Sequence, residues 1–179
     1  LQDEAERLRV EARDLARRLS NARDAQAAIN ALDDLADHDL PLSSRSVEKL
    51  RARIRAPWQM QDTAPQAAQM RVEITAALER AADALQHWPL HLLTFEDVAR
   101  RLALSYRAVR RAIPDNWSLA GPEDLHDLRK LVISHRHLME IVEPLWPHFA
   151  RMWVDENQTL RSHLGQYQDL GVLKRLTGL

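Results

Sequence analysis

Apolar residues recur three or four positions apart along most of this chain, and this spacing constrains its fold more than any other feature. Near the start, Leu8, Ala12, Leu15 and Leu19 form one stripe along a helix. The 179 residues include only 4 glycines, and no run of alternating β-branched residues indicates a strand. The sequence therefore predicts an all-α protein.

Interruptions of the periodicity divide the chain into expected helices. Thr94 and Asp97 form a capping box that predicts a helix start, and Pro122 suits the first position of another helix. The stripe from Leu8 marks a first helix and residues 22–38 a second, followed by a short basic segment. Further helices are expected over residues 67–87, 95–113 and 122–144, and two more complete the chain.

Two related halves are expected within a single domain that spans residues 1–179. Residues 57–66 contain two prolines without periodicity and are the expected linker between residues 1–56 and 67–179. Residues 15–29 align weakly with 160–174, and in that register the first-half counterpart of His126 would precede residue 1. The chain also begins without methionine, so we expect further residues upstream of Leu1.

Composition excludes several classes of function. The net charge of -1 and pI near 6.8 argue against a protein that coats nucleic acid by bulk basicity. There is no cysteine, no apolar stretch of the roughly 20 residues that a membrane helix needs, no HExxH motif and no glycine-rich phosphate loop. His135 and His137 are two apart and point in different directions on a helix. We therefore expect no metal, cofactor or catalytic site.

Basic side chains gather on one side of each of two successive helices. A helical projection of residues 122–144 places His126, Arg129, Lys130 and His137 around Ile133, opposite a stripe of Leu128, Leu131, Val132, Leu138, Met139 and Val142. In residues 95–113, Arg100, Arg107 and Arg111 lie opposite Val98, Leu102, Tyr106, Val109 and Ile113, with Arg110 at the flank. Both basic faces point away from the expected core.

These faces are either solvated surface or an anion site. Solvated helices mix charge signs at i,i+4 spacing, whereas Arg107, Arg110 and Arg111 have no acid within four residues upstream, and Asp115 is the first downstream. His126 alone would be an ordinary surface or capping histidine, but beside arginine and lysine it is equally suited to hold an anion. The segregation of charge favours a local anion site.

Several segments together resemble a known family. "SYRAVRRAI", "LHDLRK", "WP" and "LRSHLGQYQDLGVL" are similar to the second half of a CHAD domain, the conserved histidine α-helical domain, and "LARRLSNARDAQ" is similar to the end of its first half. The resemblance implies two four-helix bundles related by a pseudo-twofold axis, with a basic central cavity that binds inorganic polyphosphate. It also implies a binding module rather than an enzyme, located in the cytoplasm, where it can associate with polyphosphate granules and polyphosphate-associated proteins.

The resemblance also implies which residues bind. His126, Arg129 and Lys130 match the family's histidine motif, Arg107, Arg110 and Arg111 match its basic helix, Arg13 lies in the first-half match, Arg17 shares its stripe, and His137 joins them on the basic face. The chain also departs from the family. Ser20 and Gln168 replace a usual glycine and a frequent histidine, and Leu131, Ile133, Arg136 and His137 stand where more basic and aromatic residues are usual.

Other functions stay open at this point. The module could gather substrate for a polyphosphate or triphosphate hydrolase, or it could be a scaffold that docks an acidic protein. Nucleic acid is expected at most as a weak competitor without sequence specificity, because few exposed aromatics are expected for its bases to stack on. If His126 contacts the anion, binding should tighten as the pH falls toward about 6.

Overall fold

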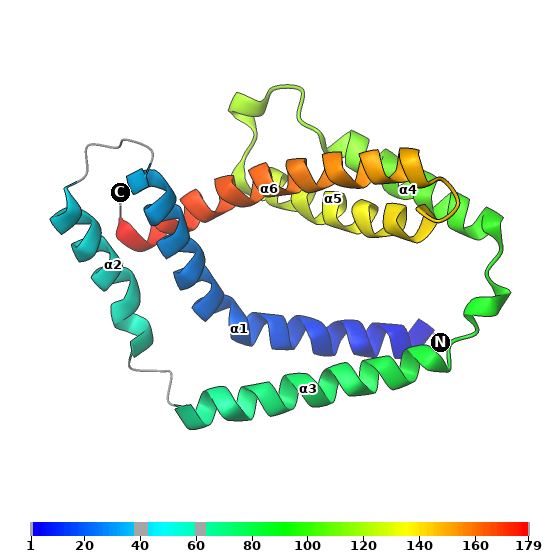
Figure 1. Ribbon diagram of the computed structural model, residues 1–179, viewed down its shortest axis with the longest axis horizontal. Coiled ribbons are helices and arrows are strands. Elements are labelled where there is room, and N and C mark those ends of the chain that lie inside the picture. Colours follow the sequence, from blue (N-terminus) through cyan, green and yellow to red (C-terminus); the bar gives the residue numbers. More distant parts are fainter. Residues whose placement is uncertain (1, 38–42, 60–63, 179) are drawn as a thin grey trace. The chain divides into compact units, whose positions relative to one another are not determined.

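The computed structural model describes residues 2–37, 43–59 and 64–178, and within these ranges every regular element is helical (Figure 1). The α-helices are α1 (Gln2–Asp37), α2 (Ser44–Gln59), α3 (Ala64–Gln86), α4 (Phe95–Ala112), α5 (Pro122–Val142) and α6 (Pro147–Thr177), and short 3-10 helices cover Leu90–Leu92 and Trp117–Leu119. The all-α prediction is confirmed. In the same ranges, none of the helices has the length and apolar character to span a bilayer.

The chain forms two compact units. Unit 1 comprises Leu1–His91 with Val172–Leu179, and unit 2 comprises Leu92–Gly171, so that α6 begins in unit 2 and ends in unit 1. The expected halves, residues 1–56 and 67–179, follow the sequence repeat and stay a prediction. Helices α2 and α3 extend into both ends of the expected linker, residues 57–66, and its centre, residues 60–63, lies outside the described part.

The core of unit 1 lies where the second half of α1 packs on α2 and on the end of α6. Ile29 and Leu32 of α1, Ile54 of α2 and Leu173 of α6 are all at most 5% exposed. Burial of such side chains contributes about 1.5–3 kcal/mol each. This end of unit 1 is therefore held by an apolar core.

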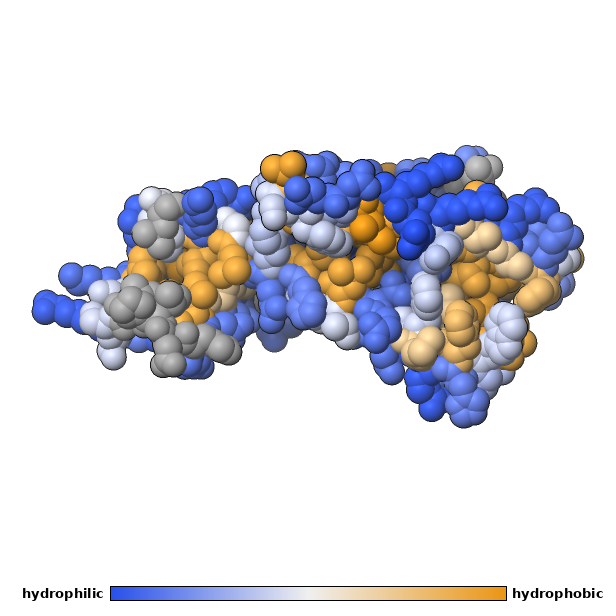
Figure 2. Space-filling model, turned by 90° about the horizontal axis from the view of Figure 1, so that it is seen from above, coloured by the Kyte–Doolittle hydropathy of each residue, from blue (hydrophilic) through white to orange (hydrophobic). Residues whose placement is uncertain are grey.

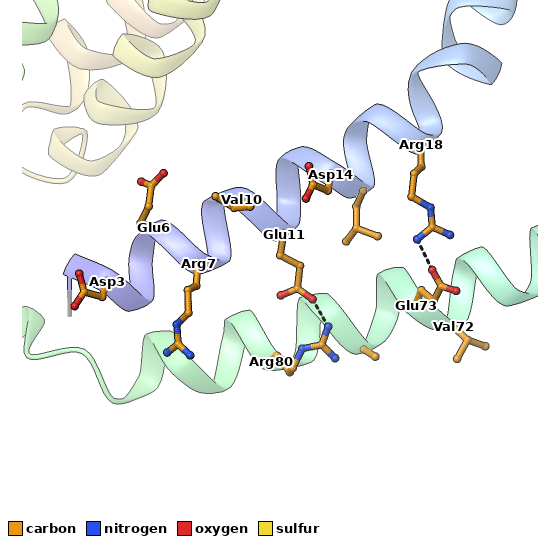
Figure 3. Close-up of a pocket in the computed structure, with 12 residues that line it drawn as sticks. Asp3, Glu6, Arg7, Val10, Glu11, Asp14, Arg18, Val72, Glu73 and Arg80 are labelled. Atoms are coloured by element: carbon orange, nitrogen blue, oxygen red, sulfur yellow. Dashed lines mark hydrogen bonds and ion pairs between the residues drawn. The ribbon is translucent and has the colours of Figure 1, made fainter.

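The first half of α1 contacts α3 mainly through charged side chains (Figure 3). Arg18 reaches Glu73 at 2.6 Å, Glu11 pairs with Arg80, and the Trp88 indole N–H donates to Glu4 at 2.9 Å. The apolar side chains here are poorly covered, since Val10 is 42% and Val72 63% exposed. Leu19, at the end of the predicted stripe, is likewise exposed.

Unit 2 is built from α4, α5 and the first part of α6. Leu128 and Val132 of α5 are completely buried, against Val109 of α4 and Leu164 of α6. A second cluster further along the same helices contains Met139, Val142 and Ala150. The burial predicted for α5 is confirmed at Leu128, Val132, Met139 and Val142, whereas Tyr106 of α4, which was expected inside, is 40% exposed.

Local signals fix the starts of α4 and α5. The Thr94 hydroxyl accepts from the Asp97 N–H at 3.2 Å, and Asp97 accepts from the Thr94 N–H at 3.0 Å, which confirms the capping box. The Thr94 hydroxyl also donates to the Asp97 carboxylate at 2.6 Å, and this bond first, then the one from the Thr94 N–H, holds the pKa of Asp97 below its ordinary value. Pro122 occupies the first position of α5, and the Gly121 N–H donates to Asp124. The sequence alone predicted both of these helix starts.

Two expectations about helix boundaries are wrong. Residues 2–37 form one helix rather than two, and residues 147–177 likewise form one. Figure 1 shows that α1 changes direction near its middle, but no proline or glycine interrupts its hydrogen bonding. In α6, Gly165 and Gly171 lower helix propensity by only about 1 kcal/mol each, which packing overrides. The short basic segment after residue 43, for which the sequence predicted no particular secondary structure, forms part of α2.

Candidate anion-binding surface of unit 2

Three arginines project from the last two turns of α4. Arg107, Arg110 and Arg111 are all exposed, and among the described residues none of them has a salt bridge or side-chain hydrogen bond. They point outward because Val109 faces the core, and positions 107 and 111 lie about 160° away from it around the helix. Arg100, two turns earlier, is paired with Glu96 at 3.1 Å. The unpaired positive charge is therefore concentrated at one end of α4.

A structural role explains part of this charge. Arg110 and Arg111 stand in the last turn of α4, where positive side chains interact favourably with the helix dipole. Arg107 lies one turn earlier, beyond the reach of that effect. The helix dipole therefore explains the position of at most two of the three arginines. It does not supply a carboxylate that would pair with them.

Two basic side chains at the start of α5 lie against α6. His126 and Arg129 are both partly buried. The His126 Nδ1 is 3.3 Å from Oε1 of Gln168, and the Arg129 Nε lies 3.5 Å from the position that a Cβ would take at Gly165. Each step of three residues along α5 matches a step of three in the opposite direction along α6. The two helices are thus antiparallel here, and α6 supports both side chains.

The basic turns of α4 and α5 flank one core cluster. Val109 of α4 and Leu125 and Leu128 of α5 belong to the same buried group, and Figure 1 shows the connection between the two helices at this end. Each basic side chain of these turns lies within one helical turn of one of those core residues. The set is Arg107, Arg110, Arg111, His126 and Arg129. The structure therefore places five of the predicted basic side chains at one end of unit 2.

The other predicted site residues are distributed differently. Lys130 pairs with Asp127 at 2.9 Å, His137 with Glu140 at 2.8 Å, and Arg17 with Asp14 at 3.5 Å. The hydrogen bond from Lys130 lowers the pKa of Asp127 below its ordinary value. Arg13 is exposed and makes no salt bridge within the described ranges.

Arg13 and Arg17 belong to unit 1, and the other seven predicted residues belong to unit 2. The central cavity between two bundles stays a prediction.

Sequence reasoning missed the buried His135 of α5. This side chain is 2% exposed, its Nε2 accepts from the Trp153 indole N–H at 3.0 Å, and its Nδ1 lies 3.2 Å from the Ser105 hydroxyl. Burial lowers the pKa of His135 below its ordinary value. The sequence contained the signal, because position 135 lies three after Val132 and four before Met139, on the buried stripe.

The opposite end of unit 2 is apolar. A cavity of about 710 Å³ is lined by thirteen residues without a single Asp, Glu, Lys or Arg, and the rings of Phe149 and Trp153 stack at its wall. Large side chains such as Phe95 and Trp146 stay about 70% exposed. Figure 2 shows apolar side chains reaching the surface among polar ones. The charged and apolar ends of unit 2 are therefore chemically distinct.

No group of three or more His, Cys, Asp or Glu side chains within residues 2–37, 43–59 and 64–178 could hold a metal ion. The chemistry that the site offers is that of guanidinium and imidazole groups, which donate hydrogen bonds to oxyanions. The fold and the site thus define an all-α protein with a local basic surface.

The family model of the CHAD domain matches residues 1–177, and the chain belongs to this family. No match was found among curated proteins or among solved structures.

Proposed function

We propose that this chain binds inorganic polyphosphate, as a binding module and not as an enzyme. Membership of the CHAD family supports the choice of ligand class. The observation that carries the proposal is the exposed group Arg107, Arg110 and Arg111, which has no carboxylate partner in the described part of unit 2. Like charges on successive turns repel each other, and a bound polyanion would relieve that repulsion.

The expected mechanism is electrostatic. A polyphosphate chain presents regularly repeated charge, and arginines one helical turn apart are about 5–6 Å apart at Cβ, so successive side chains can contact successive phosphates. Each guanidinium can donate two hydrogen bonds to phosphate oxygens. Binding should release counterions and should therefore weaken steeply as salt is added. The expected setting is the cytoplasm, with polyphosphate granules as one location.

The test compares two pairs of arginines that differ in their partners. Wild-type protein, Arg107→Ala/Arg111→Ala and Arg100→Ala/Arg151→Ala would be titrated with long-chain polyphosphate at one ionic strength. The control pair removes the same charge from the same unit, but Arg100 and Arg151 are bonded to Glu96 and Glu143. We expect the first variant to lose about tenfold or more in affinity and the control to lose much less. Equal losses would contradict the site, and no binding by wild type would contradict the function.

Chain length provides a second discrimination. A surface that contacts repeated charge should bind long polyphosphate more tightly than tripolyphosphate, because more contacts form within one molecule. A surface built to dock an acidic protein has no reason for that preference. Affinity independent of chain length would therefore argue for a protein partner instead.

A further inference from the structure

The contact between His126 and Gln168 determines which nitrogen of the imidazole carries the proton. The atom of Gln168 that faces His126 Nδ1, at 3.3 Å, is the amide oxygen Oε1, which can only accept. In this orientation of the amide, Nδ1–H is the donor to Oε1. In neutral imidazole the other nitrogen, Nε2, then holds the lone pair, and it contacts no hydrogen-bond partner in the described part of the chain.

We propose that Gln168 is a positioning residue for His126: it holds the Nδ1–H tautomer and the ring orientation, so that Nε2, once protonated, donates a hydrogen bond to a bound anion. This inference rests on the proposed function. It adds Gln168 of α6, which is not among the predicted site residues. Gln168 itself does not contact the anion in this proposal.

The packing of α5 on α6 fixes the position of Gln168. One turn away, Arg129 lies against Gly165, and Leu128 and Leu164 are buried between the helices in the same cluster. The antiparallel register that brings Arg129 to Gly165 also brings His126 to Gln168. Because Gln168 and His126 both stand on packed helices, their side chains lose little further conformational entropy when one orients the other.

The charged groups near His126 lie on α4, α5 and α6, beginning with Glu123 one turn earlier on α5. On α5, Asp127 and Lys130 are bonded to each other, and Arg129 lies one turn away. On α6, Asp169 follows Gln168, and on α4 the turn from Arg107 to Arg111 lies at the same end of unit 2. The partner at Nδ1 is the neutral amide, so a change at position 168 alters the tautomer without removing a charge.

The first experiment needs no ligand. Imidazole ¹⁵N shifts of His126 at about pH 8 report which nitrogen is protonated. We expect the Nδ1–H form in wild type and a shift toward the Nε2–H form in Gln168→Leu. Gln166→Leu, an exposed position two residues away on the same helix, should leave the tautomer unchanged. Gln168→Asn, which keeps the amide but shortens its reach, serves if the leucine variant fails to fold. An Nε2–H wild type, or a tautomer indifferent to position 168, overturns the proposal.

The second experiment measures long-chain polyphosphate binding at about pH 6 and pH 8. The gain in affinity on acidification should be about tenfold in wild type and in Gln166→Leu, the equivalent of one charge-assisted hydrogen bond. In Gln168→Leu that gain should shrink, because neutral His126 in the Nε2–H form already donates to the anion at pH 8 and raises the affinity there. If the gain in affinity on acidification is the same in Gln168→Leu as in wild type, the inference is contradicted but the proposed function is not. If wild type binds polyphosphate at neither pH, the proposed function is overturned, and so is the proposed hydrogen bond from His126 to the anion. The tautomer experiment still decides whether Gln168 positions His126.

Discussion

The first half of α1 and the last turns of α4 use the same residue, arginine, in opposite ways. In unit 1, Arg18 and Arg80 bond to carboxylates on the facing helix, in a contact where Val10 and Val72 stay largely exposed. In unit 2, Arg107 and Arg111 have no such partner in the described structure, and the helices are held by buried side chains instead. Where the apolar core is thin, charges connect the helices; where it is thick, Arg107 and Arg111 are not needed for that contact.

The largest expected effect tests the core of unit 2. Leu128→Ala should lower the free energy of unfolding by about 2–5 kcal/mol, because the side chain is completely buried and its removal leaves a cavity. Leu78→Ala in α3, where the leucine is 66% exposed, should cost about 0.5 kcal/mol or less. Chemical denaturation of both variants would check this. Similar losses would contradict the contrast between the two units.

The next effect concerns His135. His135→Leu removes the acceptor of the buried Trp153 N–H and the partner of Ser105, which should cost about 1–3 kcal/mol.

The wild type should also be sensitive to acid at this residue. Burial lowers the pKa of folded His135, so the unfolded chain, with a histidine pKa of about 6.5, binds the proton more readily. The contribution of neutral His135 to stability is therefore complete above about pH 6.5 and is lost as the pH falls below it. The free energy of unfolding, measured by denaturation at pH 7.5 and pH 5, should decrease less on acidification for His135→Leu than for wild type. Equal decreases would mean that His135 is not the group responsible.

Removing the cap of α4 should have a smaller effect. Thr94→Ala should destabilise unit 2 by about 1 kcal/mol, since the Asp97 N–H loses its acceptor. Thr94 also lowers the pKa of Asp97, so the cap contributes most above the ordinary aspartate pKa of about 4 and loses strength as the pH drops below it. Thr94→Ser, which can make the same bonds, is the control. Thermal melts that rank serine with alanine would contradict a capping role.

The smallest effect lies in the contact of α1 with α3. A double-mutant cycle of Arg18→Ala and Glu73→Ala should give a coupling of about 0.2–1 kcal/mol, because both side chains reach solvent, at 51% and 34% exposed. In about 1 M salt the coupling should nearly disappear. A coupling that survives salt would show that this contact depends on packing, and would remove the distinction drawn between the two units.

Local sequence determined the class of fold and the helix starts of unit 2. The all-α assignment followed from periodicity and from the scarcity of glycine, and Thr94, Asp97 and Pro122 act within one turn of chain, where the tertiary structure has little influence. The outward direction of Arg107 and Arg111 also followed, because the angle between residues on a helix is fixed once Val109 is known to face inward.

Only the tertiary structure decided the lengths of α1 and α6 and the partners of the histidines. A weak helix former inside a helix costs little when neighbouring helices pack on it, so propensity alone suggested ends where the helices continue. His126 contacts Gln168, and His135 contacts Trp153 and Ser105, across separations of 18 to 42 residues. Such pairs depend on the register of one helix against another, which the packing of buried side chains sets and a single-helix pattern does not contain.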